Sequence, residues 1–256
     1  MNLTGDIDDT VTPAVETGKL ASNISNTNGT INVLGNISTN GKTINQATVN
    51  VGNDTITATL DNLTNPSTIT TNGDINIAST GTVSSAANNL IANGANGIAN
   101  NGILNLNGGA LASKITGSNG VTSIAGDVTS DKDITQDTIF VGSSGADTSG
   151  YYPSPVTADG SFTNTGNIDA DYIYVTTNGV LNQNGGTLGT SANPTYIDSD
   201  CVLNITDGTV TAESISTWED GVTTINGGTV NVDYDIYTTD DATTNITGGT
   251  VVADTI

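Results

Sequence analysis

Thr224-Ile-Asn-Gly-Gly-Thr-Val230 is followed by Asn245-Ile-Thr-Gly-Gly-Thr-Val251, a second copy of nearly the same heptapeptide. Earlier copies are Asn182-Gln-Asn-Gly-Gly-Thr-Leu188 and Asn204-Ile-Thr-Asp-Gly-Thr-Val210. The threonine before the last residue stands at positions 187, 209, 229 and 250, so successive units contain 22, 20 and 21 residues. A period of this length indicates a repeat architecture.

Each unit contains three short segments that favour β-strands. In one unit they are residues 209–212, 214–217 and 222–225, where apolar and polar side chains alternate as in half-buried strands. One unit cannot bury its own apolar side chains, whereas stacked units form a continuous core. We therefore predict an all-β fold, a right-handed parallel β-helix (β-solenoid) with three short strands and about 21 residues per rung. The many Asn-Gly pairs also suit hairpins, so an antiparallel β architecture is the alternative.

The repeat predicts which side chains stack in the interior. We expect three inward columns, formed by Val210, Val230 and Val251, by Ile215 and Ile236, and by Leu203, Ile225 and Ile246. Thin columns of this kind need few large side chains. They explain why only 4% of the residues are aromatic.

The rest of the chain fits one elongated domain with two interruptions. Residues 1–22 are expected to form an irregular N-terminal cap or a disordered start, and residues 23–256 a single solenoid. The stretch 142–155 lacks strand periodicity and contains two of the five prolines, so we expect a loop inserted there. The chain stops at Ile256, inside a new rung. We expect either a longer parent protein or an end that another subunit covers.

The charge balance limits the partners. The formal net charge is −22, with four lysines and no arginine. Nucleic acids are excluded because they need many cationic contacts, and anionic membranes would repel the chain. The expected partners are cations, neutral surfaces and glycans. The single cysteine, Cys201, excludes an internal disulfide. No run of about 18 apolar residues exists, so no membrane insertion of this segment is expected.

The Gly-Gly-Thr-Val/Leu motif, set in units rich in Thr and Asn, resembles passenger domains of bacterial autotransporters and adhesins of the filamentous-haemagglutinin type. The resemblance covers the repeats from about Leu104 onward. It implies export, display at the cell surface, and adhesion or structural spacing. Residues 1–20 lack the pattern of a signal peptide, so an extracellular location requires a signal outside this chain.

Catalysis is not expected, although some parallel β-helices degrade polysaccharides. The chain has no histidine for acid–base chemistry and no arginine for a lyase. Hydrolases need two carboxylates, which Asp8-Asp9 or Asp240-Asp241 could supply, but acidic pairs are ordinary in turns of a chain with 26 acidic residues. We predict a non-enzymatic adhesin-like passenger or stalk that presents loops to a host surface, glycan or protein partner. A self-assembling subunit of a filament, sheath or surface layer is the alternative, and a polysaccharide-degrading enzyme is the third hypothesis.

Two groups of residues are candidates for binding. Stacked rungs would bring carboxylates within about 5 Å of one another, and Ca²⁺ prefers such oxygen ligands. Ca²⁺ is the only cofactor considered, and outward hydrated carboxylates are the favoured alternative. The acidic candidates are Asp198, Asp200, Glu219, Asp220, Asp240 and Asp241. The aromatic candidates for stacking on a partner are Tyr151, Tyr152 and Trp218, followed by Tyr234 and Tyr237.

Overall fold

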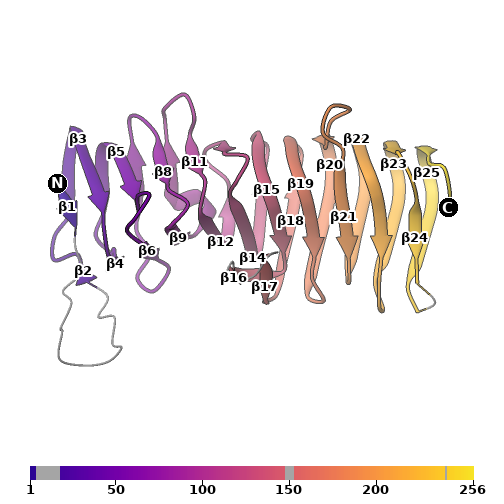
Figure 1. Ribbon diagram of the computed structural model, residues 1–256, viewed down its shortest axis with the longest axis horizontal. Coiled ribbons are helices and arrows are strands. Elements are labelled where there is room, and N and C mark those ends of the chain that lie inside the picture. Colours follow the sequence, from indigo (N-terminus) through magenta and orange to yellow (C-terminus); the bar gives the residue numbers. More distant parts are fainter. Residues whose placement is uncertain (4–17, 148–152, 240) are drawn as a thin grey trace.

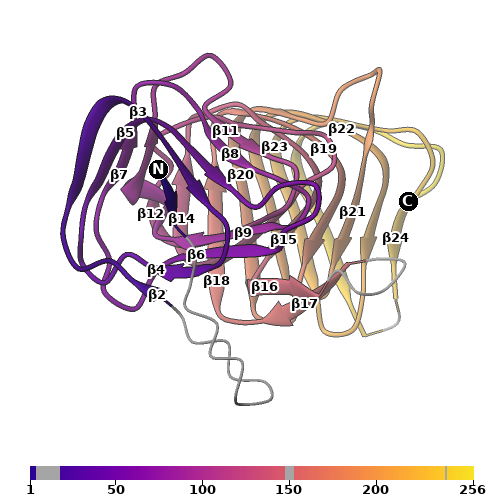
Figure 2. The same cartoon turned by 60° about the vertical axis from the view of Figure 1, so that its left-hand side comes forward.

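The chain forms a parallel β-solenoid of about 11 turns with roughly 21 residues per turn. This computed structural model describes residues 1–3, 18–147, 153–239 and 241–256. Strands of one turn pair in parallel with those of the next, so 23 strands form one continuous wound sheet. Figure 1 shows the turns in a row with the two termini at opposite ends, and Figure 2 shows how the chain winds. The predicted fold class is confirmed.

Many strands are short because each turn bends after a few residues, and the longer ones continue around a corner, as β22 does over 16 residues. In the first half they are β1 (Asn2–Leu3), β2 (Gly18–Lys19), β3 (Ile24–Val33), β4 (Asn36–Ser38), β5 (Ile44–Val51), β6 (Ala58–Asn62), β7 (Ile69–Thr71), β8 (Ile75–Ile77), β9 (Gly81–Ser85), β10 (Leu90–Ala92), β11 (Ile98–Asn100), β12 (Ile103–Ala110) and β13 (Ile115–Thr116). In the second half they are β14 (Val121–Ser130), β15 (Ile134–Val141), β16 (Ser143–Asp147), β17 (Ser154–Thr157), β18 (Gly160–Asn164), β19 (Asn167–Val175), β20 (Gly179–Leu188), β21 (Thr195–Ser199), β22 (Val202–Thr217), β23 (Val222–Val232), β24 (Ile236–Thr238) and β25 (Thr243–Val252). One 3₁₀ turn, η1 (Ala87–Asn89), is the only helical element among the described residues. None of these residues forms a helix long and apolar enough to cross a membrane.

Three faces run along the solenoid, and each is built on a column of inward side chains. Face A carries Ile31, Val49, Ile75, Ile98, Ile115, Ile134, Ile168, Leu188, Val210, Val230 and Val251. Face B carries Ile37, Leu60, Val83, Leu104, Thr122, Ile139, Ile173, Ile197, Ile215 and Ile236. Face C begins with Ile24, Ile44, Ile69 and Leu90 and ends with Ile205, Ile225 and Ile246.

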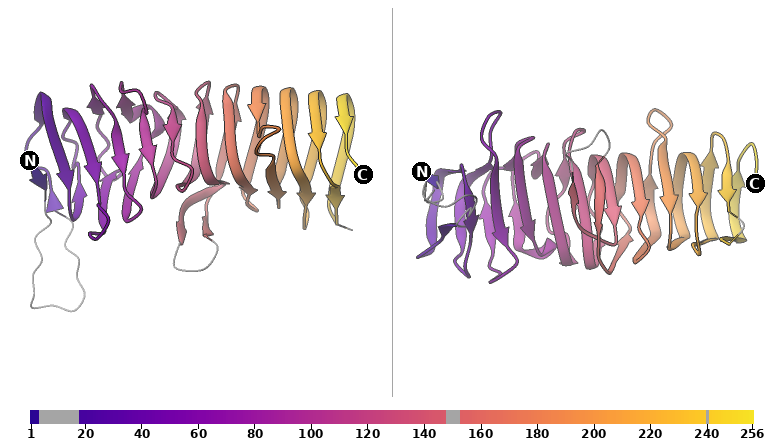
Figure 3. Two further views of the ribbon diagram at one scale, coloured as in Figure 1. Left: turned by 45° about the horizontal axis from the view of Figure 1, so that its top comes forward. Right: turned by 60° about the horizontal axis from the view of Figure 1, so that its bottom comes forward.

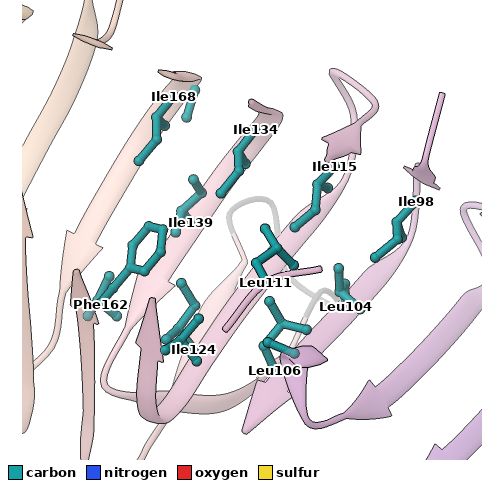
Figure 4. Packing of buried hydrophobic residues seen from close by; sticks show 14 of the residues in the cluster. Ile98, Leu104, Leu106, Leu111, Ile115, Ile124, Ile134, Ile139, Phe162 and Ile168 are labelled. Carbon is teal, nitrogen blue, oxygen red and sulfur yellow. The ribbon is translucent and has the colours of Figure 1, made fainter. Parts of the chain in front are cut away.

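These columns are the core. Ile98, Ile115 and Ile168 are at most 1% exposed. Figure 4 shows them in line with Ile134 on face A. Burying one such side chain contributes about 1.5–3 kcal/mol, so a long column of medium-sized residues replaces the bulky core of a globule.

Two of the three predicted columns are confirmed, and one of the three residues predicted for the third column is wrong. Val210, Val230 and Val251 lie in register, as do Ile215 and Ile236. In the third column Ile225 does pair with Ile246, but the residue below Ile225 is Ile205. Leu203 pairs with Thr223, a buried threonine whose hydroxyl lies 2.7 Å from that of Thr217. A shift of two residues keeps a side chain on the same face, so alternation alone does not reveal it.

Glycine sets the corner between faces C and A. Gly228 has φ +70°, and Gly186, Gly208 and Gly249 hold similar positive values at the same place in their turns. A Cβ on Gly228 would lie 2.7 Å from the carbonyl oxygen of Gly208 in the preceding turn. Only glycine adopts this conformation without strain, which explains why the motif keeps a glycine before its threonine.

The stretch 142–155 differs from the loop that its sequence suggested. Strands β16 and β17 pair in an antiparallel hairpin that projects from the row of turns (Figure 3); residues 148–152 lie outside the described part. All four side chains of β17 are exposed, so no apolar alternation marks this strand in the sequence. Strand β16 lies close to Asn105 of β12, with 3.7 Å between Asn105 Oδ1 and a Cβ built on Gly145.

The N-terminal segment is also more regular at its ends than expected. Asn2–Leu3 pairs with β3, and Gly18–Lys19 pairs with β4, so both continue the parallel sheet. The remainder of the expected cap, residues 4–17, lies outside the described residues.

Candidate functional site

Aromatic side chains gather on the outer surface of face B in the C-terminal half. Tyr172 and Tyr174 alternate with inward residues on β19, and Tyr196 lies opposite Tyr172 on β21. The ring centroids of Tyr172 and Tyr196 are 5.5 Å apart, and those of Phe140 and Tyr174 are 5.3 Å apart. The planes in these pairs differ by 14° and 23°, so the rings stack along the solenoid axis.

Trp218 and Tyr237 extend this aromatic surface toward the C-terminal turns. Trp218 follows β22 in a turn and is 40% exposed, while Tyr237 on β24 is 48% exposed. Their centroids are 5.3 Å apart with planes tilted by 55°, so the two rings are in contact without stacking face to face. This pair leaves more aromatic surface open to a partner than the stacked tyrosines do.

Backbone and side-chain hydrogen bonds hold Trp218 in place. Its backbone N–H donates to the carbonyl oxygen of Ser199 at 2.9 Å, and Gly221 N–H donates to the carbonyl oxygen of Trp218 at 2.9 Å. The indole Nε1–H donates to Asp198 Oδ1 at 3.5 Å. The turn backbone is thus held in place, and the ring adds one long hydrogen bond of its own.

Three carboxylates lie close to this turn. Asp198 contacts the indole edge, and Glu219 follows Trp218 in the turn with φ +54°. Partial burial, with the nearby charges of Glu219 and Asp198 adding to it, raises the pKa of Asp200. Trp218, Tyr237, Asp198, Asp200 and Glu219 are called the Trp218 cluster below. It combines an aromatic surface with negative charge, which favours cationic groups.

Tyr196 borders the cluster and keeps its proton over a wide pH range. A side-chain hydrogen bond to Glu213 is the main cause that raises the pKa of Tyr196 to about 12, and desolvation and the Glu213 charge add to it. Its hydroxyl is therefore engaged with Glu213.

The carboxylates of the predicted calcium ladder do not all lie opposite one another in successive turns. Ser216, not a carboxylate, lies directly opposite Asp198 in the next turn, and Tyr237 follows above Ser216. Asp220 and Asp241 are exposed turn residues, and Asp240 lies outside the described part of the chain. Within that part, no three His, Cys, Asp or Glu side chains are grouped so that they could hold a metal ion. Calcium binding therefore stays a prediction.

The aromatic candidates have different outcomes. Trp218 lies exposed in a turn at the position where the sequence suggested a partner contact. Tyr151 and Tyr152 lie outside the described residues. Tyr172, Tyr174 and Tyr196 were not among the residues predicted to bind a partner. Their signal is the Tyr-Ile-Tyr alternation at 172–174, which predicts both tyrosines on the outer side of a strand whose isoleucine points inward.

No protein-family model, no curated protein and no solved structure matches this chain.

Proposed function

We propose that this chain is a non-catalytic rod displayed at a cell surface, an adhesin-like passenger or stalk that binds a partner through the Trp218 cluster. The observation that carries the proposal is a tryptophan, 40% exposed, that contacts an exposed tyrosine and the carboxylate of Asp198. Tryptophan and tyrosine are enriched where interfaces gain most of their binding energy. The extracellular location rests on the resemblance of the Gly-Gly-Thr motif to surface adhesins.

The chemistry of the cluster defines the kind of partner. A cation over an indole face gains up to about 2 kcal/mol where it is desolvated. Asp198 and Glu219 add attraction at short range, and the net charge of −22 adds it at long range. The partner is therefore a surface that carries amino or guanidinium groups, either on a protein or on an amino sugar.

Fluorescence can test this directly, because Trp218 is the only tryptophan of the chain. Titration with chitosan oligosaccharides and with a lysine-rich peptide should shift its emission. Tyr237→Ala should weaken the binding about tenfold, as expected for an aromatic residue at the centre of an interface. Val156→Ala is the matched control, since Val156 is 52% exposed on β17 and lies outside the cluster.

Binding that survives both Trp218→Ala and Tyr237→Ala, measured by calorimetry, would contradict the role of the cluster. The non-catalytic part of the proposal has its own test. Incubation with a panel of acidic and neutral polysaccharides should release no reducing ends and no unsaturated products.

Self-assembly is the second candidate, and one observation favours it. Ile246 belongs to the inward column of face C but is 41% exposed, and Val252 on the same strand is 58% exposed. A second copy stacked on β25 would cover Ile246 and pair the strand edge of β25, whereas Val252, opposite Asn231, points to the outer surface of face A. Electron microscopy at rising protein concentration should then show filaments, whereas particles of constant length would count against assembly.

A further inference from the structure

A row of asparagines crosses the outer surface of face A in the first turns. Asn2, Asn32, Asn50 and Asn76 lie directly opposite one another on β1, β3, β5 and β8. Each side chain donates an Nδ2–H to the Oδ1 of the previous one, at 3.0 Å from Asn32 to Asn2, 2.7 Å from Asn50 to Asn32 and 2.8 Å from Asn76 to Asn50. The amides are therefore held at the spacing of the strands, about 4.8 Å.

This row lies in a groove of about 470 Å³, called the asparagine groove. Besides the four asparagines of the row, its lining residues are Leu34, Gly52, Asn53, Ile77, Ala78, Ala99 and Asn101. None of these lining residues is charged, although the chain as a whole carries a net charge of −22. The groove is thus a neutral, amide-rich surface with small apolar side chains, and its chemistry differs from that of the Trp218 cluster.

The amides keep hydrogen-bonding capacity for a ligand. A primary amide has two N–H donors and an oxygen with two lone pairs. Asn32 and Asn50 each use one donor and one lone pair within the row, so one donor and one lone pair per side chain remain outside these bonds. Rigid groups that already lie in place bind a ligand with little further loss of entropy.

We propose that the asparagine groove binds a neutral, hydroxyl-rich glycan chain. A sugar hydroxyl both donates and accepts a hydrogen bond, which matches the paired donor and acceptor of each amide. Ala78 and Ala99 offer apolar contacts for C–H surfaces of the sugar rings. An anionic glycan meets the repulsion of the whole chain, and a cationic one meets no carboxylate among the lining residues. This site rests on the proposed function in one respect, the presentation of the outer faces of the rod to partners.

The groove and the Trp218 cluster can be tested separately because they lie on different faces and in different turns. The asparagines belong to face A from β1 to β8, and the cluster belongs to face B from β21 to β24. A ligand of the groove should leave the fluorescence of Trp218 unchanged. Loss of one site does not imply loss of the other.

Side-chain amide resonances of asparagine in a ¹⁵N-labelled sample give the first readout. Neutral cello-hexaose and malto-hexaose are the probes, and oligogalacturonate is the anionic comparison. We expect at least one neutral hexasaccharide to shift Asn32, Asn50 and Asn76, and oligogalacturonate to shift none of them. Asn182 and Asn204 are internal controls, because they form the same bond, Asn204 Nδ2 to Asn182 Oδ1 at 2.9 Å, outside the groove.

Two variants give the second readout, a dissociation constant from calorimetry. Asn50→Asp removes a donor and adds a negative charge, and Ala99→Phe fills the groove while the row stays intact. Each should weaken binding of the hexasaccharide about fivefold or more, since a lost hydrogen bond to a ligand has about this effect. Asn182→Asp is the matched control and should bind as the parent does. Melting curves verify that all three variants are folded.

Several results would overturn the groove. They are an absence of asparagine shifts at millimolar saccharide, equal shifts at Asn182 and Asn204, or unchanged affinity in folded Asn50→Asp and Ala99→Phe. If a saccharide instead changes the emission of Trp218 and leaves the groove unaffected, the groove proposal fails and the proposed function stands. If saccharide binds in the groove while no cationic partner binds the cluster, the groove stands and the Trp218 cluster loses its role.

Discussion

At the scale of single residues, the turn glycines place the strongest demand on the sequence. Gly228 has φ +70°, and a side chain there would meet the carbonyl oxygen of Gly208. The left-handed conformation costs a non-glycine residue about 1–2 kcal/mol, and the close contact adds to this. The alternating strand residues between such glycines vary more freely, which is why the repeat is easiest to see at its turns.

We expect Gly228→Ala to lower the free energy of unfolding by about 2 kcal/mol, for the two reasons given. Urea unfolding followed by circular dichroism measures it. Gly145→Ala on β16 is the control. An added Cβ at Gly145 would have its nearest neighbour, Asn105 Oδ1, at 3.7 Å, and the φ of Gly145 is not positive, so this substitution should have a small effect. Equal losses in the two variants would contradict the role of the corner.

Asp200 gives a prediction on pH. The pKa of Asp200 is raised in the folded chain, so its negative charge lowers the free energy of unfolding. This cost is absent well below the ordinary pKa of 3.8, and it is fully present above the raised pKa. Asp200→Asn should therefore stabilise the protein at neutral pH, by about 0.5 kcal/mol because the group is only partly buried and solvent screens its charge. The gain should vanish in strongly acidic solution. Melting temperatures of both proteins across pH check this, with Asp54→Asn in an exposed loop as the control.

At the scale of elements, the inward columns make neighbouring turns depend on each other. Ile134 pairs with Ile115 on one side and Ile168 on the other, and all three are almost completely buried. In a stacked repeat each turn touches only its neighbours, so damage to one turn stays near it.

Ile134→Ala should cost about 2–5 kcal/mol, because it removes buried methyl groups and leaves a cavity. Hydrogen exchange should accelerate in β13, β15 and β19 and much less in β23 and β25. Ile103→Ala is the control, since Ile103 lies on the outer side of β12 and is only partly buried. Exchange that accelerates equally along the whole chain would show that the turns do not behave as local units.

Much of the strand arrangement could be predicted from the sequence. The heptapeptide copies predict the register of Val210, Val230 and Val251, because glycine turns and alternating apolar residues specify the same alignment. The register of Leu203 could not be predicted, since a threonine, Thr223, occupies an inward position and satisfies its hydroxyl with Thr217. The hairpin β16–β17 could not be predicted either, because the exposed strand β17 carries no apolar pattern.

The candidate sites were less visible than the fold. Trp218 could be predicted at a turn, but its neighbours come from other turns, and their approach depends on a register that sequence alone left uncertain. The asparagine row combines residues from four strands with irregular spacing, since Asn32, Asn50 and Asn76 are separated by 18 and 26 residues. Asparagine is common throughout this chain, so no local pattern distinguished these positions.

At the scale of the whole molecule, charge repulsion opposes folding. A net charge of −22 with only four lysines makes the folded rod repel itself. Raising NaCl from about 10 mM to about 0.5 M should raise the melting temperature, because salt screens charges beyond a Debye length. Unchanged melting over this range would mean that the carboxylates are too far apart to matter.

The same experiment tests calcium. CaCl₂ at equal ionic strength should raise the melting temperature beyond NaCl only if a site such as the predicted ladder binds the ion. Added EDTA should then lower the melting temperature in CaCl₂ to the value measured in NaCl. Equal melting temperatures in the two salts, and no change with EDTA, would show that the protein has no stabilising calcium site.

The strands pair along the long axis of the solenoid, and this arrangement has a mechanical consequence. A pull on the two ends loads the hydrogen bonds between turns in tension, so turns peel away one after another. Each released turn of roughly 21 residues extends to about 70 Å, whereas it adds only about 4.8 Å while folded. A solenoid of this construction lengthens more than tenfold before its backbone is taut, and the successive release of its turns dissipates the work of a sudden pull.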